Sequence, residues 1–126
     1  MRAVRVITLL GGLFFLSFGL WAFLGPRSFF DRIATYAPYN PHLIHDLGAF
    51  QLGIGATLLL ALVWTDALLA ALAGASAGGI LHFSAHVQDR HLGGRTSDPA
   101  SIGVIAALLV VGAVLQARAV GRKGAG

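Results

Sequence analysis

Histidine and aspartate side chains with metal-binding chemistry lie in two short stretches of the sequence, residues 42–46 and 82–89. His82, His86 and Asp89 are spaced four and three residues apart, which places them on one face of a helix. Neutral imidazole nitrogen and carboxylate oxygen bind zinc and other first-row transition ions. The candidate cofactor is therefore zinc or another first-row ion. The candidate metal ligands are His45, Asp46, His82 and His86.

Other polar residues accompany these ligands and are candidates for binding a ligand or handling a proton. They are His42, Gln51, Asp89 and Arg90. Three interpretations of the whole set remain open. The side chains hydrogen-bond to each other and to water and only fix the fold, or they hold a metal ion, or they serve a proton relay, a quinone or a heme. Nothing resembles a Ser/His/Asp triad, and no catalytic residue is assigned.

Four long apolar runs must position these polar residues. The chain is 56% hydrophobic and 11% charged, whereas a soluble domain carries about a quarter charged residues. Each run approaches the roughly 20 residues that a membrane-spanning helix needs, and none alternates as barrel strands do. The sequence therefore predicts an all-α integral membrane four-helix bundle, built as one domain over residues 1–126. The predicted helices cover residues 5–25, 41–64, 66–90 and 99–119.

Capping residues mark several helix ends. Asn40 precedes a proline, as an N-cap precedes proline at the first helical position, and Asp98 repeats the pattern. Residues 26–39 carry aromatic residues at helical spacing, which predicts a short interfacial amphipathic helix, with a plain loop as the alternative. Residues 120–126 are predicted to form a disordered basic tail. The first apolar run exceeds the length of a signal-peptide core, so we expect it to be retained.

The nine basic residues lie at the ends of the apolar runs, as membrane flanks do, and form no patch for nucleic acid. Five would share a membrane side with the termini: Arg2, Arg5, Arg118, Arg122 and Lys123. Four would face the other side: Arg27, Arg32, Arg90 and Arg95. The excess of one predicts that both termini are cytoplasmic. The expected partners are the lipid bilayer and either further copies of the chain or a larger membrane complex.

A tight turn at Thr65 and Asp66 joins the second and third predicted helices. If these two helices pair as an antiparallel hairpin, residues at equal depth have numbers that sum to about 131. His45 then lies level with His86, which would bring the two polar stretches into one site inside the bundle. Small residues continue both stripes and are expected to pack against neighbouring helices. They are Gly48, Ala49, Gly53, Ala75 and Gly79.

Three motifs carry a resemblance to a known group: Tyr39-Asn40-Pro41-His42, His45-Asp46-x-Gly48-Ala49-Phe50-x-x-Gly53-x-Gly55, and His82-x3-His86. With these motifs the chain resembles small four-helix bacterial membrane proteins, mainly actinobacterial, which in turn resemble the DoxX-like proteins. The resemblance implies four helices in a bacterial cytoplasmic membrane. Members that resemble DoxX are often described as membrane partners of oxidoreductase systems. No site residue is carried over from the resemblance.

Two functional hypotheses follow from the sequence. In the first, the protein is a non-enzymatic accessory or interaction subunit, and the histidines and aspartates are internal scaffolding. In the second, it binds a metal ion or a small redox cofactor through these side chains. The first predicts that replacing His82 or His86 lowers stability with no ligand lost, whereas the second predicts that a bound metal or cofactor disappears.

Overall fold

The computed structural model describes residues 2–124, and these residues form helices and connecting loops without a strand. Four helices are long and apolar enough to cross a membrane, which confirms the predicted all-α four-helix architecture. The long helices are α1 (Arg2–Leu24), α3 (Pro41–Leu60), α4 (Leu68–Gln88) and α5 (Asp98–Gly124). The short elements are α2 (Pro26–Arg32) and the 3-10 turn η1 (Thr65–Ala67).

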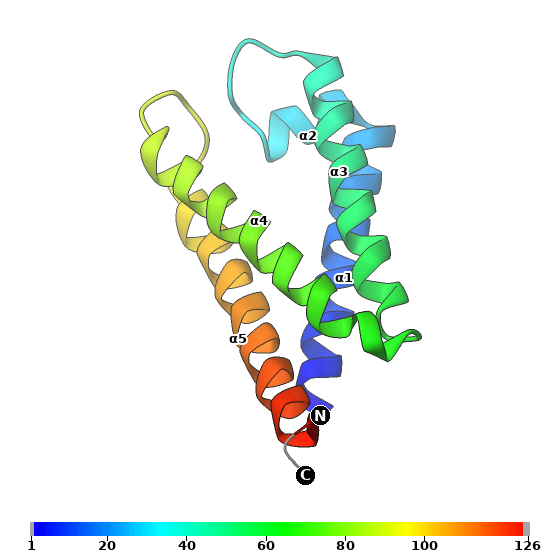
Figure 1. Ribbon diagram of the computed structural model, residues 1–126. Helices are drawn as coiled ribbons and strands as arrows, with labels where there is room; N and C mark the ends of the chain where they lie inside the picture. The colour runs from blue at the N-terminus through cyan, green and yellow to red at the C-terminus, as the bar shows by residue number, and fades with distance from the viewer. Residues whose placement is uncertain (1, 125–126) are drawn as a thin grey trace.

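The four long helices pack as two pairs, α1 with α3 and α4 with α5 (Figure 1). The pairs meet at the end of the molecule that carries both termini and η1, which we call the terminal end. They diverge toward the opposite end, which carries α2 and the connection between α4 and α5 and which we call the loop end. The bundle is therefore a wedge, closed at the terminal end and open between α3 and α4.

Glycines bring the helices of the first pair into backbone contact. A Cβ atom added at Gly48 would lie 2.8 Å from the backbone nitrogen of Phe23 in α1. One added at Gly55 would lie 2.7 Å from the backbone nitrogen of Leu16. Gly12 of α1 would meet the side chain of Leu59 at 2.7 Å. Such close approach is how transmembrane helices gain packing energy where lipid supplies no hydrophobic driving force.

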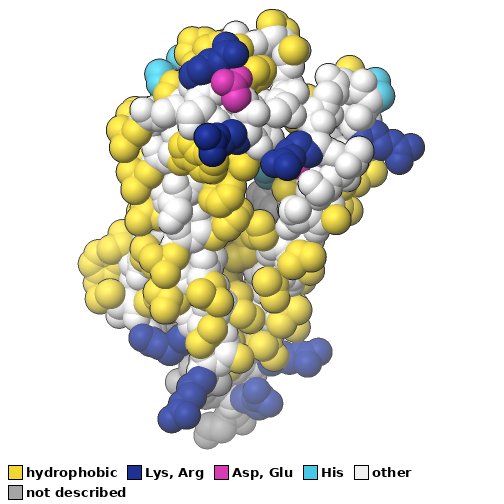
Figure 2. Space-filling model, turned by 180° about the vertical axis from the view of Figure 1, so that it is seen from behind, with side chains coloured by type: hydrophobic (Ala, Val, Ile, Leu, Met, Phe, Trp, Pro, Cys, Tyr) yellow, Lys and Arg dark blue, Asp and Glu magenta, His cyan; other side chains and the backbone are white. Residues whose placement is uncertain are grey.

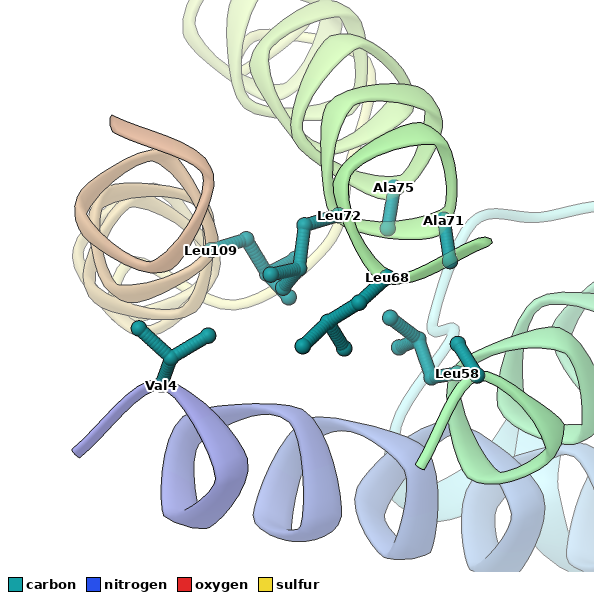
Figure 3. Packing of buried hydrophobic residues seen from close by; sticks show 8 residues of the cluster. Val4, Leu58, Leu68, Ala71, Leu72, Ala75 and Leu109 are labelled. Atoms are coloured by element: carbon teal, nitrogen blue, oxygen red, sulfur yellow. The ribbon is translucent and has the colours of Figure 1, made fainter. Parts of the chain in front are cut away.

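The largest core cluster lies where all four long helices meet (Figure 3). Leu58 of α3, Leu72 of α4 and Leu109 of α5 are almost fully buried, and Val4 brings α1 into the same cluster. The remaining members come from the connection and from the first half of α4, and they are Ala61, Leu68, Ala71 and Ala75. This cluster fixes the two helix pairs to each other at the terminal end.

A smaller cluster anchors α2 at the loop end. Phe29 of α2 is 1% exposed and packs with Ala22 of α1 and Ile44 of α3. Its ring meets Trp21 edge to face, with 5.5 Å between the ring centroids. Aromatic pairs prefer this geometry because the positive edge of one ring meets the negative face of the other. α2 is thereby held across the ends of the first helix pair.

The expected hairpin of α3 and α4 is corrected by the structure. The two helices are joined by a tight connection, but α4 then turns away from α3 and packs along α5 (Figure 1). Gly79 of α4 faces Ala106 of α5, where an added Cβ atom would lie 3.3 Å from the Ala106 Cβ. A short connection fixes only where two helices start, whereas the fit of their surfaces decides which helices run side by side.

Two segments have a structure that differs in part from the one predicted from the sequence. Residues 26–39 divide into the helix α2 and a loop that follows it, so both alternatives hold for part of the segment. The predicted disordered tail is wrong for residues 120–124, because α5 continues to Gly124. Residues 125 and 126 lie outside the described residues.

Asp98 begins α5, but its carboxylate accepts a hydrogen bond from the backbone N–H of Arg95, at 2.8 Å, rather than from within the helix.

Asn40 is confirmed as the N-cap of α3, because its side-chain oxygen accepts from the backbone N–H groups of His42 and Leu43 at 3.0 and 3.3 Å. We expect Asn40→Ala to lower the free energy of unfolding by about 1 kcal/mol, since two helical N–H groups lose their acceptor. Unfolding of the detergent-solubilised protein measures the change. Asn40→Asp retains an acceptor and serves as the control; equal losses in both variants would contradict the capping role.

Charged and apolar side chains occupy different parts of the surface of the wedge. Basic side chains gather at both ends, and a broad hydrophobic band lies between them (Figure 2). Many large apolar side chains are exposed, among them Leu10 (61%), Phe50 (74%) and Leu81 (71%). An exposed band of this size belongs in lipid, so the structure agrees with a protein that lies in a membrane.

Candidate functional site

A chain of three polar side chains lies at the loop end of α4. The Tyr36 hydroxyl oxygen lies 3.2 Å from Nδ1 of His86, and Nε2 of His86 lies 3.0 Å from Nε2 of His82. The two histidines are one helical turn apart, so the helix itself sets their spacing. His82 is exposed at the surface of the chain and His86 is half-buried. Both rings are thus accessible on one side and connected to the loop that follows α2 on the other.

Two loops hold Tyr36 against His86. Gly94, in the α4–α5 connection, has φ +80° and lies under the tyrosine ring. A Cβ atom added at Gly94 would fall 2.6 Å from the Tyr36 hydroxyl oxygen, so a side chain at this position would displace the phenol. The backbone N–H of Gly94 donates to the Thr35 carbonyl at 3.4 Å. Glycine is needed here both for its left-handed backbone and for the space.

A further contact joins the same two loops. The Arg95 guanidinium donates to the Arg32 carbonyl at 2.9 Å, so these residues bridge the open end of the wedge. Burial, followed by the negative charges of Asp98 and Asp89, raises the pKa of Tyr36 above its ordinary value of 10.0. Tyr36 therefore keeps its proton at neutral pH and meets His86 as a neutral phenol.

The second polar stretch lies on α3 and is separate. His42 Nε2 lies 3.5 Å from the Asp46 carboxylate one turn later, and both side chains are exposed. The His45 ring lies against Phe23 of α1, with 5.5 Å between ring centroids. These three residues begin α3 on the far side of the wedge from His82 and His86.

The structure therefore does not bring the four predicted metal ligands together. His45 and Asp46 stay with α1 and α3, whereas His82 and His86 move away on α4. Residues 2–124 contain no group of three or more His, Cys, Asp or Glu side chains that could hold a metal ion. The expectation of a single shared site depended on the hairpin of α3 and α4, and the divergence of these helices separates its two halves.

The remaining ligand candidates are also dispersed. Asp89 and Arg90 are exposed in the connection after α4. Gln51 of α3 is half-buried, and its side-chain oxygen is buried without a hydrogen-bond partner among the described residues. Sequence reasoning identified the His82-His86 spacing but missed Tyr36. Its aromatic ring suggested an interfacial position, and no local signal indicated that its loop folds back onto α4.

The predicted packing residues serve different interfaces. Gly48 contacts α1, and Gly79 contacts α5. Ala75 is buried in the core cluster at 7% exposure. Ala49 and Gly53 instead face an apolar groove of about 370 Å³ between α3 and α4.

A second glycine face on α4 borders this groove and was missed in the sequence. Gly74 and Gly78 are four residues apart and exposed, and a Cβ atom added at either would meet nothing within 4 Å. Gly79, one residue further, packs against α5. α4 therefore carries glycine on two faces, one of which packs against α5 and one of which is exposed beside the groove.

No protein-family model, curated protein or solved structure matches this chain.

Proposed function

We propose that the protein is a non-enzymatic interaction protein of the membrane that associates with a second copy of itself through the open face of α4. The observation that carries this proposal is the exposed pair Gly74 and Gly78. Glycines four residues apart in an apolar helix let two helices approach until their backbones touch. Inside a lipid bilayer this close packing is a main source of association energy.

The charge pattern of α4 supports a second copy as the occupant. The helix contains no Lys, Arg, Asp or Glu from Leu68 to Gln88, so a two-fold contact between two α4 helices places no like charges opposite each other. Ala70 lies one turn before Gly74 and is also exposed. The small residues therefore extend over two turns of helix, which is the row that a right-handed helix crossing brings into contact.

The oligomeric state of the protein and of Gly78→Leu tests the proposal. In lipid nanodiscs or mild detergent we expect the wild type at twice the 13.1 kDa chain mass and Gly78→Leu at the mass of one chain. The leucine side chain enters open space within its own chain, so the variant is expected to fold and only the contact between copies is blocked. Light scattering with subtraction of the detergent or lipid mass measures the outcome.

Gly121→Leu is the matched control, because Gly121 of α5 is likewise exposed and has nothing within 4 Å of an added Cβ atom. This variant should remain dimeric. A wild-type protein that stays a single chain in lipid, or a Gly78→Leu dimer as stable as the wild type, would overturn the proposal. The proposal is also overturned if the exposed face of α4 binds a different protein and no complex of two copies forms.

We also propose that both termini are cytoplasmic and that the membrane is the bacterial cytoplasmic one. The excess of basic residues on the terminal side supports the orientation, and the motif resemblance to small four-helix bacterial membrane proteins supports the location. Reporter fusions at the C-terminus, active only on one side of the membrane, distinguish the two orientations.

A further inference from the structure

We propose that His82 and His86 form a two-histidine clamp for a divalent late first-row transition ion, with Cu²⁺ as the preferred ion and Tyr36 as the residue that orients His86. This site differs from the four-ligand site expected from the sequence, because it uses neither His45 nor Asp46. Both ligands come from one chain, so the site does not depend on self-association.

The facing nitrogens are the first support. Nε2 of His82 and Nε2 of His86 are 3.0 Å apart and belong to rings on successive turns of α4. Each neutral imidazole has one nitrogen with a proton and one with a lone pair. Two Nε2 atoms at this distance must share a proton or bind a common ion, because two bare lone pairs facing each other repel.

The contact with Tyr36 is compatible with the tautomer of His86 that a metal ion needs. When Nδ1–H of His86 donates to the Tyr36 oxygen over the observed 3.2 Å, the Nε2 lone pair points toward His82. A hydrogen bond of this kind to the second ring nitrogen accompanies nearly every metal-binding histidine, since it fixes the tautomer and the ring orientation. The phenol is itself held in place by Gly94, which a side chain would push away. The second-nitrogen contact is thus built into the fold.

The nitrogen separation favours one coordination geometry. With metal–nitrogen bonds of roughly 2.0–2.1 Å, two ligands at a right angle lie roughly 2.8–3.0 Å apart, and two tetrahedral ligands lie roughly 3.3–3.4 Å apart. The observed 3.0 Å, which is also the length of an ordinary N–H···N hydrogen bond, lies closer to the right-angle value. Right-angle positions occur in the tetragonal sites of Cu²⁺ and Ni²⁺, and Cu²⁺ binds nitrogen more tightly than any other divalent first-row ion. The exposed side of His82 leaves room for water at the remaining positions.

The test is a Cu²⁺ titration of the full-length protein in mild detergent, without a histidine tag, followed by calorimetry and by electron paramagnetic resonance. We expect one Cu²⁺ per chain with hyperfine splitting from two imidazole nitrogens. His82→Gln and His86→Gln should each remove one nitrogen from the spectrum. Tyr36→Phe keeps the ring but loses the hydrogen bond, and should weaken binding on the order of 10–100-fold.

His42→Gln is the matched control, because His42 also has a polar partner one turn away on an exposed helical face. It should leave Cu²⁺ affinity and the spectrum unchanged. The proposal is overturned if His82→Gln retains the two-nitrogen signal, or if Tyr36→Phe binds as tightly as the wild type, which would mark chance binding by two surface histidines. Circular dichroism confirms that each variant is folded before the titration.

Discussion

Gly55→Ala is expected to destabilise the protein by about 3 kcal/mol, the upper end of the cost of forcing an extra methyl group into a packed interface. The three atoms nearest to an added Cβ atom at Gly55 are all backbone atoms of α1: Leu16 nitrogen at 2.7 Å, the Gly12 carbonyl oxygen at 2.9 Å and Leu16 Cα at 3.1 Å. Backbone atoms cannot rotate away as a side chain does, so the whole of α1 must shift. The free energy of unfolding in mixed detergent micelles measures the loss.

Gly53→Ala, two residues away on the same helix, is the control. An added Cβ atom at Gly53 meets nothing within 4 Å, and alanine is the better helix former by about 0.5–1 kcal/mol. Gly53→Ala should therefore unfold no earlier than the wild type. Equal stability of the two alanine variants would mean that α1 and α3 are not in backbone contact.

Phe29→Ala is expected to cost about 3–5 kcal/mol, the range for removing a buried aromatic side chain. Phe29 is 1% exposed and joins α2 to α1 and α3. Its loss leaves a cavity and releases the ring of Trp21. In a Trp64→Phe background, Trp21 is the single tryptophan of the chain, and its fluorescence should shift toward that of a solvated indole.

Phe50→Ala removes the same side chain from a position that is 74% exposed. Because this phenylalanine faces lipid or the groove rather than the packed interior, we expect little change in stability or in Trp21 fluorescence. A loss in Phe50→Ala as large as that in Phe29→Ala would show that the anchoring of α2 does not determine stability.

The helices could be predicted because each depends on local information. Apolar length and turn residues located the four spans. The Asn40-Pro41 pair predicted the first residue of α3 correctly. The end of α5 was misplaced, because a basic, glycine-containing segment was interpreted as a tail although nothing in it stops a helix. The low helix propensity of glycine favours fraying of this segment, but helix propensity alone does not determine where a helix ends.

The arrangement of the helices could not be predicted in the same way. Hydropathy shows that a helix is surrounded by apolar groups but does not distinguish lipid from another helix. α4 illustrates the difficulty, since Gly78 and Gly79 are adjacent in sequence but only Gly79 contacts α5. The candidate site was predicted only in its local part. The spacing of His82 and His86 follows from one helix, whereas the approach of Tyr36 depends on two loops that meet across the wedge.

The divergence of the two helix pairs also affects the surrounding lipid. A molecule that is narrow at the terminal end and broad at the loop end (Figure 1) displaces unequal areas from the two leaflets. Membrane curvature toward the narrow end would relieve this mismatch, so we expect the conical shape to favour bilayers that curve in that direction. At the wide end, the hydrogen bond from the Arg95 guanidinium to the Arg32 carbonyl connects the two helix pairs.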